Sequence, residues 1–189
     1  MPDTGLLFWG DVVDYTETGC EKTMVDMLAK DLRRAGFETY REVYVRRARS
    51  ICRNDSETRQ RVDLYVKLNG WALGVECKHG KPKATGTQAI KAMDQCMTAA
   101  TGFLWWKDGH YLPKPAYVVA ADPASLNGHK EHAWSDSRLL NMLRMDGCGV
   151  LIRDLGQYAI RVSYPKGPHA KGGPTQDRKT LYLTEDIYA

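Results

Sequence analysis

Apolar residues recur along the first half of this chain with two different spacings, and each spacing predicts one kind of secondary structure. Across 19–35 they return every three or four positions, which predicts a helix that ends before Gly36. The stripe positions of this helix are Glu21, Val25, Leu28, Leu32 and Ala35. Across 37–45, 61–68 and 71–78 apolar and polar residues alternate, and this pattern predicts three strands.

The second half of the chain adds helices and further strands. Helices are predicted at 87–102 and 136–146, and strands at 115–122, 149–154, 158–164 and 180–184. The strands at 149–154 and 158–164 would form a hairpin that turns at 155–157. The segment near 165–180 is rich in Gly, Pro, Lys and Arg, which predicts a basic, flexible loop. No linker divides the chain, so residues 1–189 are interpreted as one α/β (α+β) domain with a central mixed sheet flanked by helices.

The Asn69-Gly70 pair lies between two of the alternating runs and predicts a two-residue hairpin loop of type I′. Such a loop sets the register, because each residue before it is paired with the residue at the same distance after it. The expected pairs on one face are Leu68 with Trp71, Val66 with Leu73, Leu64 with Val75 and Val62 with Cys77. This face of the hairpin would be continuously apolar.

On the opposite face the same register places two acidic side chains, Asp63 and Glu76, directly across from each other. Opposed side chains in an antiparallel pair have Cβ atoms about 4.5–5.5 Å apart, and like charges there destabilise the sheet. A divalent cation such as Mg²⁺ or Mn²⁺ would neutralise both carboxylates, and Lys78 projects on the same face. The alternative is a solvated polar face on which Asp63 pairs with Lys78 or Arg61.

Asp63, twelve intervening residues and then Glu76-Cys77-Lys78, on a hairpin that follows a helix and a strand, resemble the PD-(D/E)XK nuclease superfamily. The resemblance covers roughly 19–121 and includes the order of elements, αβββαβ, to which this chain adds a C-terminal helix and strands. Val62 stands where the motif has its nominal proline, which is a frequent departure in this superfamily. The resemblance implies a restriction-endonuclease-like core.

The resemblance also implies roles for individual residues. The implied catalytic residues are Asp63, Glu76, Lys78 and Gln95, and the implied ligands of one or two Mg²⁺ or Mn²⁺ ions are Asp63, Glu76, the Cys77 backbone carbonyl and Glu21. Two of these assignments have competitors. Glu21 also fits a capping box with Thr18. Gln95 fits equally well as an ordinary polar residue at the edge of a helix face, as does Gln88.

Positive charge is unevenly distributed, although the net charge of the chain is only +4. The segment 46–61 contains six arginines against two acidic residues, and arginine suits bidentate contacts with phosphate. The residues expected to contact DNA are Arg46, Arg47, Arg49, Arg53, His79, Lys81, Lys171 and Arg178. A solvated loop with ordinary surface arginines explains the same segment equally well.

Several classes of protein are disfavoured by the sequence. No apolar run approaches the roughly 18 residues of a membrane span, and the first residues lack a signal-peptide pattern, so a cytoplasmic protein is expected. The five cysteines form no CxxC pair, so zinc binding and redox chemistry are not indicated. The sequence also lacks a glycine-rich phosphate loop, so no nucleotide cofactor is expected. Trp105 and Trp106 follow the second predicted helix, and one interpretation is that they stack on bases. An aromatic pair at a helix end is more typical of a core or dimer contact, which is the favoured interpretation.

The resemblance and the charge distribution together imply a divalent-metal-dependent DNA endonuclease that leaves 5′-phosphates. Because no recognition domain is added, the chain resembles a structure-selective or nicking enzyme of DNA recombination or repair, either phage-type or Holliday-junction-resolvase-like. A homodimer would let two sites cut two strands. The alternative from another class is a non-catalytic DNA-binding or assembly module on the same fold. The joint presence of Asp63, Glu76 and Lys78 favours the enzyme.

Overall fold

The computed structural model describes residues 15, 20–48, 58–78, 85–121, 126–127, 147–164 and 177–184. These residues form an α+β fold with two helices and one mixed sheet of nine strands. In chain order the elements are α1 (Glu21–Arg34), β1 (Glu38–Arg46), β2 (Arg59–Lys67), β3 (Ala72–Cys77), α2 (Thr85–Ala100), β4 (Leu104–Lys107), β5 (His110–Leu112), β6 (Tyr117–Ala121), β7 (Cys148–Asp154), β8 (Gln157–Tyr164) and β9 (Asp177–Tyr182). The predicted order of helix, three strands, helix and strand is confirmed, with β4 and β5 added between α2 and β6.

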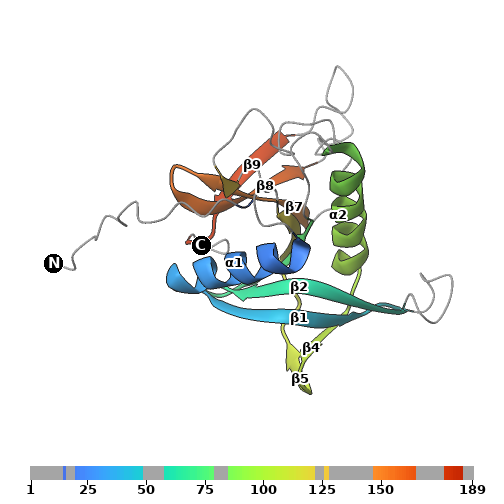
Figure 1. The fold of residues 1–189 in the computed structure, drawn as a ribbon. Coiled ribbons are helices and arrows are strands. Elements are labelled where there is room, and N and C mark those ends of the chain that lie inside the picture. The colour runs from blue at the N-terminus through green and yellow to red at the C-terminus, as the bar shows by residue number, and fades with distance from the viewer. Residues whose placement is uncertain are drawn as a thin grey trace.

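The strands lie side by side in the order β5-β4-β1-β2-β3-β6-β7-β8-β9. β6 runs parallel to both of its neighbours, β3 and β7, and the other neighbouring pairs are antiparallel. A parallel pair needs a long return connection, and α2 lies within the one that joins β3 to β6. Figure 1 shows that the β4–β5 hairpin extends beyond β1, while β7, β8 and β9 form the opposite part of the sheet.

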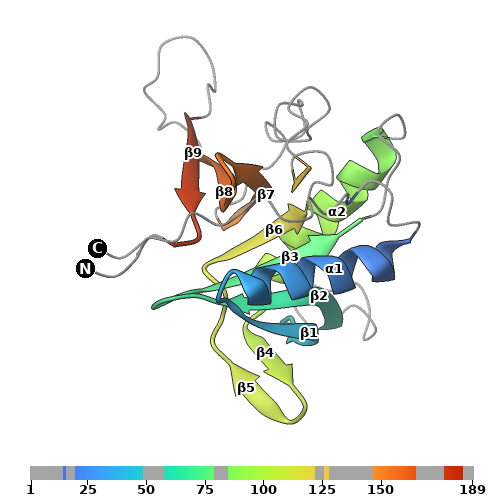
Figure 2. The ribbon, with the colours of Figure 1, turned by 60° about the vertical axis from the view of Figure 1, so that its left-hand side comes forward.

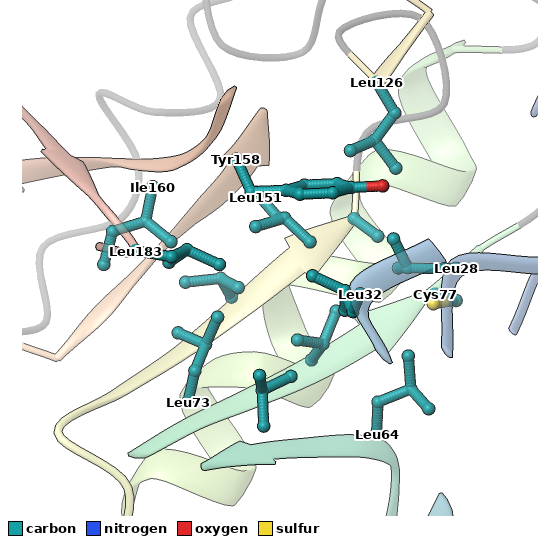
Figure 3. Close-up of a cluster of buried hydrophobic side chains, with 14 of the residues drawn as sticks. Leu28, Leu32, Leu64, Leu73, Cys77, Leu126, Leu151, Tyr158, Ile160 and Leu183 are labelled. Carbon is teal, nitrogen blue, oxygen red and sulfur yellow. The ribbon is translucent and has the colours of Figure 1, made fainter. Parts of the chain in front are cut away.

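The two helices cover opposite faces of the sheet (Figure 2). The buried residues of α1 are Met24, Val25, Leu28, Ala29 and Leu32, which confirms most of the predicted stripe. Ala35 is the exposed C-cap instead, because the helix ends one residue earlier. Figure 3 shows Leu28 and Leu32 beside Leu64 and Leu73 in the core between α1 and the sheet.

The core on the other face lies between α2 and the sheet. Ala92, Cys96 and Ala99 of α2 are fully buried there, and their small side chains let the helix approach the strands closely. Trp105 is 1% exposed in this same core, which confirms the core interpretation for this tryptophan. Gly102 follows α2, and a Cβ at this position would lie only 2.0 Å from Val45 Cγ1.

A polar cluster anchors α1 to the far part of the sheet. The hydroxyls of Tyr158 and Tyr15 both donate to Asp31 of α1, the latter at 3.1 Å. The Arg153 guanidinium lies 3.8 Å from the same carboxylate and 5.4 Å from the centre of the Tyr158 ring. These contacts hold the C-terminal half of α1 against β7 and β8.

The turn at Asn69-Gly70 confirms the predicted register and corrects the predicted turn type. The paired residues run from Lys67 opposite Ala72 to Leu64 opposite Val75, without a bulge at Gly74. Gly70 has a φ of 78°, but Asn69 does not have the positive φ that a type I′ turn needs at its first loop position. The type I′ prediction was therefore wrong. Glycine carries the left-handed conformation alone, because it has no Cβ to clash.

Side chains of β1 and β2 change faces at one level of the sheet. Leu64 and Val66 pack against α1, but Val62 packs in the α2 core, although strict alternation would place it with Leu64. In the neighbouring strand Val43 also belongs to the α2 core, directly after Glu42, whose φ of 53° breaks the regular strand geometry. The prediction that Val62 shares the apolar face with Cys77 was therefore wrong.

Three other expectations concern the C-terminal half and the membrane. The helix predicted at 136–146 and residues 165–176 of the predicted basic loop lie outside the described residues. The loop prediction was wrong for 177–180, because these residues belong to β9 and pair with β8. Neither of the described helices is long and apolar enough to cross a membrane.

Candidate active site

The two acidic side chains lie where the paired part of the β2–β3 hairpin ends. The last pair of the β2–β3 ladder is Leu64 with Val75, and Asp63 and Glu76 are the residues that follow it on the two strands. The backbone N–H of Cys77 donates to Asp63 Oδ2 at 2.7 Å, so a side chain of β2 holds β3 at this point. The Cys77 thiol itself is buried in the α1 core. Its backbone carbonyl as a metal ligand stays a prediction.

Burial makes the two carboxyl groups difficult to ionise together. Glu76 is only 1% exposed, and burial together with the nearby charge of Asp63 raises the pKa of Glu76 to about 8. Burial also raises the pKa of Asp63, although the Cys77 N–H and Lys78 work in the opposite direction. Burial raises the pKa of both groups, and the charge of Asp63 raises the pKa of Glu76 further, so Glu76, the more buried of the two, is the harder one to ionise.

Lys78 lies one residue beyond β3, and its side chain is close to both acids. Its Nζ donates to Glu21 Oε1 at 2.9 Å, and its side chain is 12% exposed. Burial lowers the pKa of Lys78, but the hydrogen bond and the charges of Glu21, Asp63 and Glu76 outweigh it and raise the pKa. The ammonium group therefore stays charged beside the acidic pair.

Glu21 is the first residue of α1 and is half-buried, with its carboxylate bonded to Lys78. The N-cap is Cys20, so Glu21 does not occupy the third helical position that a capping box with Thr18 requires. The capping-box interpretation was therefore wrong. Within the part of the chain that the structure describes, no group of three or more His, Cys, Asp or Glu side chains is arranged to hold a metal ion. The structure shows Glu21 in contact with Lys78, and its role as a ligand stays a prediction.

Gln60 is a site residue that the sequence did not single out. Its Nε2 donates to Glu76 Oε1 at 3.2 Å and to the backbone carbonyl of Gln95 at 3.0 Å, so it joins β2, β3 and α2. Strict alternation along β2 would turn Gln60 toward α1, and the change of face at Asp63 turns it toward Glu76 instead. A glutamine three residues before the first acid is the only sequence signal for it.

Gln95 lies at the candidate site, as its predicted role requires, but it contacts Gln60 through its backbone rather than its side chain. Its Oε1 atom is buried, as is Oε1 of Gln60, and neither has a hydrogen-bond partner among the described residues. Unpaired buried amide oxygens are costly, and they mark a place that a donor or a cation would stabilise. The side chain of Gln88, the other glutamine of the helix, lies outside the described residues.

The donor set around Glu76 fits a hard divalent cation. Asp63 and Glu76 offer carboxyl oxygens, and Gln60 meets Glu76 through its Nε2 rather than its oxygen. Mg²⁺ is commonly bound by one or two protein carboxylates and keeps several water ligands. A third carboxylate is therefore not required, and loss of the Glu76 proton would accompany binding of the cation.

The residues expected to contact DNA are only partly described. Arg46 is exposed at the end of β1, whereas Arg47 is half-buried and donates from Nε to Thr101 Oγ1 at 3.1 Å. Arg178 lies in β9, but its side chain is outside the described residues. The remaining positions, Arg49, Arg53, His79, Lys81 and Lys171, also lie outside them. The predicted role of these residues in DNA binding stays a prediction.

The chain was compared with protein-family models, with curated proteins and with solved structures, and no match was found in any of the three. Its chemistry is therefore inferred from the residues and geometry described above.

Proposed function

We propose that this protein is a divalent-metal-dependent DNA endonuclease with a restriction-endonuclease-like core of the PD-(D/E)XK type. The observation that carries the proposal is the pair of the buried Glu76 and the partly buried Asp63 at the end of one hairpin, with Lys78 beside it. A buried acidic pair is costly for the fold, so a purely structural role would favour its replacement by apolar residues. Two acids with a lysine beside them are the same residue types that carry the resemblance to the PD-(D/E)XK nucleases.

Each residue has a chemical task in the proposed reaction. Asp63 and Glu76 would hold one or two Mg²⁺ or Mn²⁺ ions, which would polarise the scissile phosphate and lower the pKa of a bound water. Lys78 has three N–H groups, and Glu21 accepts from one of them. The other two can donate to the attacking water and to a phosphate oxygen, where negative charge develops. Glu21 would thus act as a positioning residue for Lys78.

The experiment is a cleavage assay with purified protein, Mg²⁺ or Mn²⁺, and labelled DNA in branched, nicked and linear forms. Wild-type protein is expected to cut branched or nicked DNA in preference to linear duplex, because we propose a structure-selective enzyme. Lys78→Ala is expected to reduce the cleavage rate by roughly 10²–10³-fold, the usual effect of removing one donor that stabilises a transition state. DNA binding should change much less.

Lys91→Ala is the matched control, because Lys91 is an exposed lysine on α2 and its loss changes the net charge equally. Its cleavage rate should equal that of wild type. If wild-type protein cuts none of the DNA forms with either ion, the enzyme proposal fails. A wild-type protein that binds DNA without cutting it would support the non-catalytic DNA-binding module instead.

A further inference from the structure

An aromatic and basic patch lies on the sheet face turned away from α2, at the C-terminal end of β1. We define the patch by six residues of four neighbouring strands: Tyr44 and Arg46 of β1, Arg59 and Arg61 of β2, Trp106 of β4, and Tyr111 of β5. Tyr44 is paired with Arg61 on one side and with Trp106 on the other, and Trp106 is paired with Tyr111. Directly paired residues project on the same face of a sheet.

The face of the patch follows from its buried neighbours. Val43, Val45 and Trp105 are buried in the α2 core, so Tyr44 and Trp106, which alternate with them, must project on the opposite face. Part of the patch is hollowed. Tyr44, Trp106, Arg59, Arg61 and Gln60 line a cavity of about 500 Å³, which lies within the range of about 300–1,000 Å³ typical of ligand sites.

The aromatic rings of the patch form an exposed stacking surface. The rings of Tyr44 and Trp106 are stacked, with centroids 5.6 Å apart and planes inclined by 20°. Tyr44 is 43% exposed and Tyr111 is 75% exposed, although large aromatic side chains are usually buried. A stacked pair keeps its outer ring faces available for a further planar group.

The charges around these rings are mostly positive. Arg61 lies 3.5 Å from Glu42. Within the described residues no carboxylate lies at ion-pair distance from Arg46 or Arg59. Guanidinium groups beside exposed aromatic rings match a ligand that combines phosphates with planar bases. A purely apolar protein partner would leave these charges without compensation.

We propose that the patch binds an unpaired strand of DNA, with bases stacked on Tyr44 and Trp106 and phosphates held by Arg46, Arg59 and Arg61. An unpaired strand is favoured over duplex because bases within a duplex stack on one another and do not present their faces to a side chain. The inference deepens the proposed function, on which it rests for the choice of DNA.

Gln60 lies in β2 between Arg59 and Arg61 and lines the cavity. Its side chain projects on the opposite face of the strand, toward α2, where it donates to Glu76 and to the Gln95 carbonyl. The patch and the Gln60–Glu76 contact therefore lie on opposite sides of β2. The patch is proposed as a surface that holds the unpaired part of a branched or nicked substrate.

The experiment measures DNA binding by fluorescence anisotropy in EDTA, so that no cleavage is needed. The probes are a fluorescent 15-nucleotide oligothymidylate and a 15-base-pair duplex. We expect wild-type protein to bind the single strand at least tenfold more tightly than the duplex. Trp106→Ala and Tyr44→Ala should each weaken single-strand binding by roughly 5-fold to 100-fold, the range that corresponds to loss of one stacked base. Trp106→Phe should retain most of the affinity, because phenylalanine also stacks.

Two controls separate stacking from charge and from general effects. Arg59→Ala should weaken binding and reduce the slope of log K against log salt by about 0.7, as expected for one lost phosphate contact on a single strand. Arg34→Ala removes the same charge from the exposed end of α1, and Leu155→Ala removes an exposed apolar side chain from the β7–β8 hairpin. Both control variants should bind as wild type does.

Several results would overturn the inference. They are unchanged single-strand affinity in Trp106→Ala and Tyr44→Ala, equal or tighter binding of the duplex, or self-association of the protein that Trp106→Ala abolishes. The proposed function can fail separately. If the patch variants lose single-strand binding but wild-type protein cuts no DNA, the patch stands and the nuclease proposal falls. If cleavage is present but the patch variants bind as wild type does, the nuclease proposal stands and the patch falls.

Discussion

Glu76 is the residue whose environment is hardest to explain without a ligand. It is almost completely buried, its charge is disfavoured by burial and by Asp63, and its hydrogen-bond partner Gln60 has an unpaired oxygen of its own. Protonation of Glu76 would remove this cost in the metal-free protein, and a divalent cation would remove it in the proposed metal-bound protein. Both solutions have consequences that can be measured.

The stability of the metal-free protein should fall as pH rises. Below a pH of about 4.5 Glu76 is protonated in both the folded and the unfolded chain, and between there and about 8 only the folded chain keeps the proton. Folding then takes up a proton, so the free energy of unfolding decreases by about 1.4 kcal/mol per pH unit within this window. Urea unfolding in EDTA at pH 5.5 and 7.5 would measure the decrease.

Glu76→Gln is the matched variant for this measurement, because glutamine has nearly the same shape and does not titrate. Between pH 5.5 and 7.5 the free energy of unfolding should decrease in both proteins, and the decrease should be about 2–3 kcal/mol smaller in Glu76→Gln than in wild type. Equal losses in the two proteins would show that Glu76 is not protonated in the folded state at pH 5.5.

The sequence predicts the opposition of Asp63 and Glu76 but not the role of Gln60. The opposition follows from one local signal, since Asn69-Gly70 sets the register over the next few residues. The orientation of Gln60 depends instead on the change of face at Asp63. That change occurs at the level of Glu42 in the neighbouring strand. Glu42 has a positive φ, and a glutamate gives no indication of such a conformation in the sequence. Local alternation therefore identifies the acids and misses their partner.

Among the secondary-structure elements, the hairpins show which turn sequences predict the backbone conformation that the structure has. The turns at Asp108-Gly109 and Leu155-Gly156 both have positive φ at two successive residues, the pattern of a type I′ turn. The first of these joins β4 to β5. Its Asp-Gly dipeptide is a typical hairpin signal, but no hairpin was predicted there. The second was predicted from its flanking strands although leucine is a poor residue for this conformation.

Leu155 offers a test of that turn. It has a φ of 48° and is 86% exposed, so its side chain contributes strain and almost no burial. Leu155→Asn should raise the free energy of unfolding by a few tenths to roughly 1 kcal/mol, because asparagine tolerates the left-handed conformation. Leu155→Ala also removes the leucine side chain, but alanine does not favour the left-handed conformation. This variant should therefore change the free energy of unfolding less than Leu155→Asn, or not at all. A thermal melt in which Leu155→Asn is less stable than Leu155→Ala would contradict the assigned turn geometry.

For the whole molecule, the sequence predicts the α+β class and the central order of elements, because periodicity and turn residues specify them locally. The order of strands in the sheet was not predictable in the same way. β1 lies between β2 and β4, although nearly sixty residues separate β1 from β4 in the sequence. The patch around Tyr44 and Trp106 exists only because of that pairing. This is why Trp106 could not be distinguished from its buried neighbour Trp105 by sequence.

The same arrangement concentrates the proposed chemistry on one part of the molecule. α1 delivers Glu21, α2 delivers Gln95, and β2 and β3 deliver the acids and Gln60. We propose that these elements together hold a divalent cation at Asp63 and Glu76. A measurement of Mn²⁺ binding examines this proposal without depending on the correct DNA or on the catalytic step.

The measurement is the dissociation constant of Mn²⁺ at pH 6.5 and 7.5, for wild type, Asp63→Asn, Glu76→Gln and the control Asp108→Asn, whose exposed carboxylate lies on the β4–β5 turn. We predict that wild type and the control bind up to about tenfold more tightly at pH 7.5, because the cation displaces the Glu76 proton. Asp63→Asn should bind far more weakly, and Glu76→Gln should lose both affinity and pH dependence. Equal Mn²⁺ binding by all four proteins would show that the hairpin is not a metal site.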